Sequence, residues 1–168
     1  MKYKIDPKFS GVEIKTKDKK LFFKNKLFSL SSEIKDEQGH VIATLERKGW
    51  WNLCFHLTTG EGTYEFIGKR GRFHIISEET GEHFNTDQFG VDLYSNKGVC
   101  VTEFSRISII GNKYYLVIHN EAHEMALLMA SCVVYKKTIE ANHMSIGCCR
   151  TVKSSGQKND LEPVDKIV

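Results

Sequence analysis

The run Met125–Tyr135 constrains the fold of this 168-residue chain more than any other stretch. It reads Met-Ala-Leu-Leu-Met-Ala-Ser-Cys-Val-Val-Tyr, which is long enough for a helix but has no polar face. A surface helix keeps a polar stripe, whereas a helix that is apolar all round must be buried all round. The run is also much too short to span a bilayer, which takes about 20 residues. It therefore predicts a helix that the rest of the chain encloses.

The sequence before this run predicts many short antiparallel strands. Between residues 20 and 118, apolar and aromatic segments alternate with turn signals such as Asp36-Glu-Gln-Gly39 and Glu78-Glu-Thr-Gly81. Residues 51–58 show the two-residue period of a strand with one buried face, and short apolar runs beside turn signals predict further strands at residues 107–110 and 114–118. A sheet of about ten to twelve strands tends to curl and close on itself. We therefore predict a mainly β fold, a roughly twelve-stranded closed antiparallel β-barrel that encloses the hydrophobic C-terminal α-helix.

The helix is expected over about residues 121–137. Asn120 suits its N-cap, Glu121 and Glu124 place negative charge at the positive end of the helix dipole, and Lys136-Lys137 place cations at the other end. The chain length and its average composition favour one domain, residues 1–142. Residues 143–168 are polar and aperiodic, so we expect a disordered tail.

The net charge of +3 hides an uneven distribution. Residues 1–26 carry nine lysines and three acidic residues, so the remainder of the chain has an excess of acidic residues. Such a basic block suits an anionic partner, either a lipid surface or a nucleic acid, and it equally suits a solvated strand face. Nucleic acid is the less favoured partner because no RNP-type or cold-shock motif accompanies the lysines.

Two further segments are candidates for an anion or membrane site. Gly68-Lys-Arg-Gly-Arg72 combines glycines, which let backbone N–H groups approach an anion, with arginines that grip phosphate; a solvated hairpin turn is the alternative. Trp50 and Trp51 follow a basic segment and suit either a membrane interface or the closure of one barrel end. The candidate headgroup ligands are Lys19, Lys20, Lys24, Lys26, Lys69, Arg70 and Arg72.

Signals for catalysis, metal and cofactors are weak. There is no GxSxG elbow and no CxxC pair, and His119 and His123 have Asn120 where the HExxH motif of zinc proteases has glutamate. We expect a polar corner there, with no metal, no cofactor and no enzymatic activity. The cysteines within apolar segments are expected to be buried thiols, while acylation or metal binding stays open for Cys148 and Cys149.

The order of the elements resembles the tubby C-terminal-like superfamily. The resemblance is carried by the strand pair at residues 27–42, by Gly90-Val-Asp-Leu93 and by the closing apolar helix. That superfamily includes the plant LURP-one-related proteins, the phospholipid scramblases and small bacterial proteins of about this size. Its members wrap a roughly twelve-stranded barrel around a hydrophobic C-terminal helix. Because tubby proteins bind phosphoinositide headgroups and scramblases act on membrane lipids, the resemblance implies a role at lipid, without assigning individual residues.

We therefore expect a non-enzymatic binding or scaffold module that associates peripherally with anionic phospholipid headgroups. The alternative is a protein-interaction or structural domain with no small-molecule ligand. The first residues have no signal-peptide pattern and no spanning segment follows, which favours the cytoplasm. Since Leu127, Leu128, Met129 and Val133 would fill the barrel, any ligand is expected on its outside.

Overall fold

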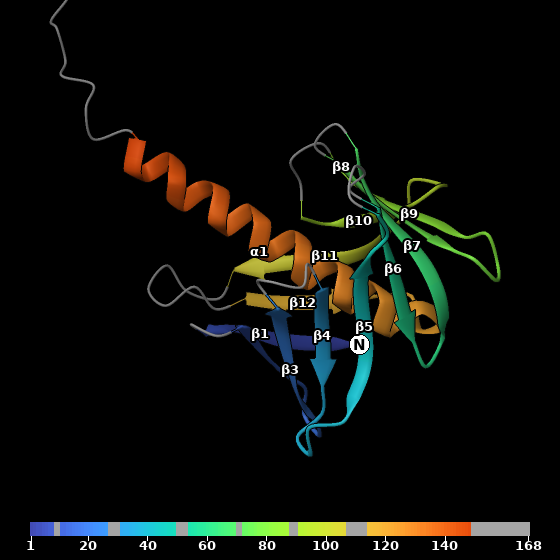
Figure 1. Ribbon diagram of the computed structural model, residues 1–168, viewed down its shortest axis with the longest axis horizontal. Coiled ribbons are helices and arrows are strands. Elements are labelled where there is room, and N and C mark those ends of the chain that lie inside the picture. Colours follow the sequence, from blue (N-terminus) through green and yellow to red (C-terminus); the bar gives the residue numbers. More distant parts are fainter. Residues whose placement is uncertain are drawn as a thin grey trace, which may run out of the picture.

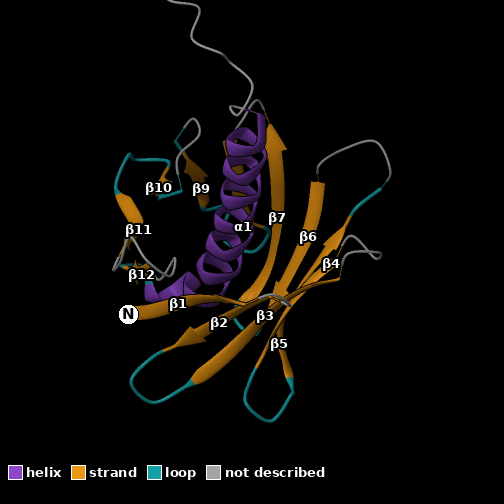
Figure 2. Cartoon of the chain, turned by 90° about the vertical axis from the view of Figure 1, so that its left-hand side faces the viewer, coloured by secondary structure: helices purple, strands orange, loops and turns teal. Residues whose placement is uncertain are grey.

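In the computed structural model, a closed antiparallel barrel of twelve strands surrounds the first part of a long helix (Figures 1 and 2). The structure describes residues 1–8, 11–26, 31–49, 54–69, 72–87, 91–106 and 114–148, apart from the side chains of residues 26, 106 and 137–148. The strands are β1 (Lys2–Lys8), β2 (Gly11–Lys15), β3 (Lys20–Lys26), β4 (Ser31–Lys35), β5 (Val41–Arg47), β6 (Cys54–Thr59), β7 (Gly62–Lys69), β8 (Arg72–Ser77), β9 (His83–Thr86), β10 (Leu93–Ser95), β11 (Cys100–Arg106) and β12 (Tyr114–Ile118). A 3-10 turn, η1 (Glu121–His123), leads into the helix α1 (Glu124–Cys148).

The barrel closes between the first and the last strand. Each strand pairs with the next one along the chain, and β1 also pairs with β12, with Tyr3 opposite Leu116. The amino group of Met1 donates to the carbonyl oxygen of Ile118 and extends this seam. Closure leaves the sheet without an exposed edge that could pair with another chain. The predicted barrel and its enclosed helix are confirmed.

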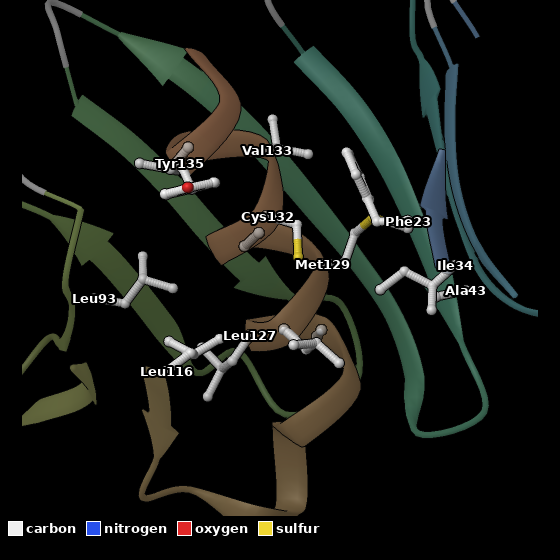
Figure 3. Packing of buried hydrophobic residues seen from close by; sticks show 14 of the residues in the cluster. Phe23, Ile34, Ala43, Leu93, Leu116, Leu127, Met129, Cys132, Val133 and Tyr135 are labelled. Atoms are coloured by element: carbon white, nitrogen blue, oxygen red, sulfur yellow. The ribbon is translucent and has the colours of Figure 1, made fainter. Parts of the chain in front are cut away.

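The core is the contact between the inward faces of the strands and the first part of α1. All ten residues from Ala126 to Tyr135 are at most 9% exposed. Figure 3 shows side chains leaving the helix on different sides, with Leu127 near Leu116 and Met129 near Phe23. This packing explains why the run has no polar face: the barrel wall surrounds the helix, so no side of it meets water.

The helix is longer than expected. It ends at Cys148 instead of near residue 137, and Figure 1 shows its last turns projecting beyond the barrel. Lys136 and Lys137 suggested a C-terminal end, but lysine is also a good residue for a helix interior, and no proline follows until residue 163. Residues 143–148 of the predicted tail are thus helical, and residues 149–168 lie outside the described residues.

Several strand predictions also have adjusted limits. β12 coincides with the predicted strand at residues 114–118, whereas β6 begins at Cys54; residues 51–53 and the expected strand at 107–110 lie outside the described residues. Within the part of the chain that the structure describes, no helix is both long and apolar enough to cross a membrane.

The strand order defines two rims. Neighbouring strands run in opposite directions, so all odd-numbered strands end at one rim and all even-numbered strands end at the other. We call the first the basic rim, because five of the six odd-numbered strands end on a basic residue: Lys8, Lys26, Arg47, Lys69 and Arg106. We call the other the acidic rim. Its described turns carry three lysines (Lys17, Lys19 and Lys97) and seven carboxylates: Asp18, Asp36, Glu37, Glu61, Glu78, Glu79 and Glu82. The helix α1 begins at the acidic rim, after β12 and the short turn η1.

Candidate functional site

The basic rim carries exposed cations that no described residue neutralises. Lys69 and Arg72 are register partners across the end of the β7–β8 pair, and both are exposed. Lys24 is exposed near the end of β3. Among the described residues, none forms an ion pair with the side chains of these three. All three side chains therefore expose positive charge at this rim.

Some other charged residues of the basic rim have described partners. The ammonium of Lys8 lies 3.1 Å from Asp6, and that of Lys48 lies 3.2 Å from Glu65, a contact that raises the pKa of Lys48 through the hydrogen bond. On the side of β9 and β10, the carboxylate of Asp92 accepts the backbone N–H of Phe104 at 2.7 Å. Among the described side chains of this rim, the cations without a described ion pair lie on β3, β7 and β8.

The predicted headgroup ligands do not form one site. Lys24, Lys69 and Arg72 share the basic rim, but Lys19 and Lys20 lie at the acidic rim, at the other end of β3. Lys26 ends β3 at the basic rim, and its side chain lies outside the described atoms. The remaining predicted residues, Arg70, Trp50 and Trp51, lie outside the described residues.

The surroundings of Lys19 and Lys20 do not suit an anion. An open hollow of about 320 Å³ lies beside these two lysines, but Asp18, Asp36 and Glu37 line the same hollow. The backbone N–H of Lys20 donates to the carboxylate of Glu37 at 2.9 Å. With three carboxylates against two ammonium groups, this hollow repels a phosphate.

Two lysines of the N-terminal basic block form ion pairs with a buried glutamate. Lys4, Lys15 and Lys20 are consecutive register partners on the outer face of β1–β3. Lys15 and Lys20 both pair with Glu13, which is only 8% exposed. The hydrogen bond from Lys15 lowers the pKa of Glu13 and raises its own. Lys15 and Lys20 thus form ion pairs within the outer face of the barrel.

At the acidic rim, a buried histidine anchors the start of the helix. The Nδ1 atom of His123 lies 2.9 Å from the hydroxyl of Tyr64, and its Nε2 contacts the carboxylate of Glu82. Since a carboxylate only accepts, we assign the proton to Nε2, and in the neutral tautomer Nδ1 then accepts from Tyr64. The order carboxylate, imidazole and hydroxyl matches a catalytic triad, but the Tyr64 side chain is 1% exposed. The arrangement ties β7, the β8–β9 turn and η1 together.

Two further carboxylates complete this anchor. Glu61, in the β6–β7 turn, accepts the backbone N–H of Met125 at 2.8 and 3.0 Å and that of Ala126 at 3.4 Å. It therefore caps the helix from a distant part of the chain. Burial, with the nearby charge of Glu124, raises the pKa of Glu61. Glu124 accepts the hydroxyl of Tyr3 at 2.7 Å.

The predicted corner between the last strand and the helix has the expected cap. The side chain of Asn120 accepts the N–H of Ala122 at 3.2 Å. The two histidines of this corner have separate partners, because His119 lies 3.3 Å from Glu103 while His123 is buried beside Tyr64. Within the described ranges, no group of three or more His, Cys, Asp or Glu side chains is arranged to hold a metal ion.

The predicted cysteine burial is only partly correct. Cys132, on α1, is fully buried, and burial raises the pKa of its thiol to about 12. Cys54 and Cys100 are half-buried, because they lie near strand ends. Cys148 is the last residue of α1, and Cys149 lies outside the described residues.

Several polar residues that make specific contacts in the structure belong to no recognisable sequence motif, so sequence reasoning missed them. Glu61 and Glu82 look like ordinary turn residues until the turns are placed against α1. His74 and His83 lie on β8 and β9 with their ring nitrogens 3.1 Å apart. Burial and the positive charges of His83, Arg72 and Lys69 lower the pKa of His74. Counting outward from the predicted turn at residues 78–81 would have placed these two histidines close together.

The chain matches no protein-family model, no curated protein and no solved structure. The roles of the two rims and of the helix anchor are therefore inferred from the geometry of this structure alone.

Proposed function

We propose that this protein is a non-enzymatic binding module that associates peripherally with anionic phospholipid headgroups through its basic rim. The observation that carries the proposal is the position of the cations. Five odd-numbered strands end on lysine or arginine at this rim, and Lys24, Lys69 and Arg72 are exposed there without an ion pair to a described residue. The proposal places the protein at the cytoplasmic face of a membrane, where anionic lipids are concentrated.

The separation of charge between the rims supports an oriented contact. A basic residue near an anionic membrane contributes about 1 kcal/mol to binding, and the attraction falls off within a Debye length of about 8 Å. Only the groups that face the membrane therefore contribute. The acidic rim, with its excess of carboxylates, is repelled, so the barrel axis is expected to stand with the basic rim toward the lipid.

Two sequence features also support lipid as the anion. Trp50 and Trp51 follow Lys48 closely in the sequence, and tryptophan is favoured at the headgroup level of membranes. The predicted resemblance to the tubby C-terminal-like superfamily implies headgroup binding. Because α1 fills the barrel, the proposal needs no internal cavity: the headgroups contact the outside of the rim.

Liposome co-sedimentation tests this proposal. The full chain is mixed with vesicles of phosphatidylcholine alone and with vesicles that also contain phosphatidylserine, at low and at high salt. We expect binding to the anionic vesicles at low salt, little binding to the neutral ones, and loss of binding at high salt. The triple variant Lys24→Glu/Lys69→Glu/Arg72→Glu should bind at least about a hundredfold more weakly, given about 1 kcal/mol for each cation.

The matched control reverses the same number of charges at the other rim, in Lys17→Glu/Lys19→Glu/Lys97→Glu, where all three lysines are exposed. This variant has the same net charge as the first and should keep most of its binding. Equal losses in the two variants would show that only net charge matters. Binding that ignores both vesicle charge and salt, or no binding at all, would reject the proposal in favour of a protein-interaction domain.

A further inference from the structure

The outer wall of the barrel carries a histidine pair that the proposed function does not use. The Nδ1 atom of His74, on β8, lies 3.1 Å from the Nε2 atom of His83, on β9, and the ring planes are inclined by 40°. In the strand register His74 is opposite Asn85 and His83 is opposite Ile76, so the two histidines are diagonal neighbours. The intervening Ile75 and Phe84 are buried in the core, which places both imidazoles on the outer face.

We propose that His74 and His83 together bind a borderline divalent cation such as Zn²⁺, each through one ring nitrogen. Zinc–nitrogen bonds measure about 2.0–2.1 Å. Two nitrogens 3.1 Å apart then subtend an angle of about 100° at the ion, between the right angle of octahedral sites and the tetrahedral angle. The nitrogens therefore already have the separation of two neighbouring ligands, and only the rings must turn to aim both lone pairs at one point.

The backbone holds this separation without the ion. β8 and β9 are paired strands of a closed barrel, so the Cα positions of both histidines are fixed by the sheet. In the absence of metal, one proton shared between the two nitrogens accounts for their contact. A bound cation would take the place of that proton, which would move to the other nitrogen of its own ring, so that each neutral imidazole presents a lone pair to the ion.

The surroundings indicate an open site of modest affinity. Both histidines are half-buried, so solvent reaches them. Asn85 lies on the same face, two residues from His83, and its amide oxygen is a candidate third ligand; water would complete the coordination. Lys69 and Arg72 act on His74 electrostatically and oppose a cation. We therefore expect weaker binding than at structural zinc sites with four protein ligands.

The pair differs from the other histidines whose side chains are described. Those four each lie next to a carboxylate: His40 to Asp36, His56 to Glu78, His119 to Glu103 and His123 to Glu82. His56 provides a matched control, because it also projects from the outer wall, on β6, two strands away from β8, and lies 3.3 Å from a single carboxylate oxygen.

The test is a titration of the full chain with ZnCl₂, followed by NMR of the histidine ring ¹⁵N signals. We expect the ring signals of His74 and His83 to shift together at the lowest zinc concentrations, before those of His56. In calorimetry, His74→Gln and His83→Gln should each weaken zinc binding by about tenfold or more, while His56→Gln leaves it unchanged.

Two results would overturn the proposal. One is an absence of change at the ring nitrogens of His74 and His83 in a molar excess of zinc, which needs no variant and so does not depend on variant folding. The other is wild-type zinc affinity in His74→Gln, which would assign the binding to other groups such as the cysteine thiols. Neither result bears on lipid binding, because the histidine variants keep the cations of the basic rim.

Discussion

The two rims of the barrel use their charged residues in opposite ways. At the acidic rim, Glu61, Glu82 and His123 bond to the helix start or to the strands around it. At the basic rim, Lys69 and Arg72 point to solvent without an ion pair to a described residue. Charge at the acidic rim therefore stabilises the fold, whereas these exposed cations of the basic rim are the ones that the proposed lipid contact uses.

The direction of the helix explains why the acids lie where they do. The N-terminal end of a helix carries a partial positive charge and several unpaired N–H groups. Glu61 satisfies the N–H groups of Met125 and Ala126, and Glu124 lies in the first turn. Carboxylates at this rim are therefore favourable, while cations there would oppose the dipole.

The largest expected effect on stability comes from the first part of α1, which is buried inside the barrel. Leu127 is completely buried, so Leu127→Ala should lower the free energy of unfolding by about 2–5 kcal/mol through lost contacts and a residual cavity. Urea unfolding followed by circular dichroism measures this. The control is Val99→Ala in an exposed turn, 61% exposed, with an effect within about 0.5 kcal/mol. Similar values for the two variants would contradict the enclosed helix.

The next largest effect should come from the histidine anchor. Tyr64→Phe removes the hydroxyl that bonds Nδ1 of His123 and leaves this buried nitrogen without its partner, at a cost of about 1–3 kcal/mol. Tyr115→Phe is the matched control: Lys2 lies over its ring, 3.9 Å from the centroid, and phenylalanine keeps that ring. Thermal or urea unfolding of both variants should show a loss only for Tyr64→Phe. If Tyr64→Phe is as stable as Tyr115→Phe, the contact between Tyr64 and His123 does not stabilise the start of the helix.

A smaller and pH-dependent effect is expected at Glu61. Glu61→Ala removes the cap of Met125 and should cost about 1 kcal/mol, whereas Glu61→Gln keeps an acceptor oxygen and should cost less. The raised pKa means that the folded protein binds the Glu61 proton more tightly than the unfolded chain does. The stabilisation from this shift is complete below the ordinary glutamate pKa of about 4.3 and is lost as the pH rises through the raised value.

Unfolding of the wild type and of Glu61→Gln, measured on both sides of that window, checks the sign. Relative to the wild type, the glutamine variant should gain stability as the pH rises, because it carries no charge to desolvate. A difference between the two proteins that stays constant with pH, or that changes in the opposite direction, would show that burial does not disfavour this charge.

The smallest effects on stability belong to the basic rim. Lys69→Ala and Arg72→Ala remove exposed cations and should change the free energy of unfolding by less than about 0.5 kcal/mol each. Their binding to anionic vesicles should nevertheless fall. A substantial loss of stability would place these residues in the fold, like those of the acidic rim, and would remove the difference between the two rims.

Much of the fold is predictable because its signals are local. The apolar run at residues 114–118, which follows a turn signal, correctly predicts β12, and the missing polar face of residues 125–135 correctly predicts burial. The end of α1 is predicted less well, because Lys136 and Lys137 suit a helix interior as well as its last turn. An element is predicted well where its local sequence signal has one meaning, and less well where the same residues suit two positions in a helix.

For the candidate site, the sequence predicts which residue types are present, but it does not predict which of them lie together. Lys19 and Lys24 belong to the same basic block, yet β3 separates their rims by about 3.3 Å for each residue of the strand. The sequence by itself determined that strands alternate, that a helix is enclosed and that lysines are abundant near the N-terminus, because periodicity and composition are local properties. Tertiary structure alone decided which cations share a rim and which acids meet the helix. Glu61 reaches Met125 of α1 and Glu82 reaches His123 of η1, from 64 and 41 residues away, and only the closure of the barrel brings them there.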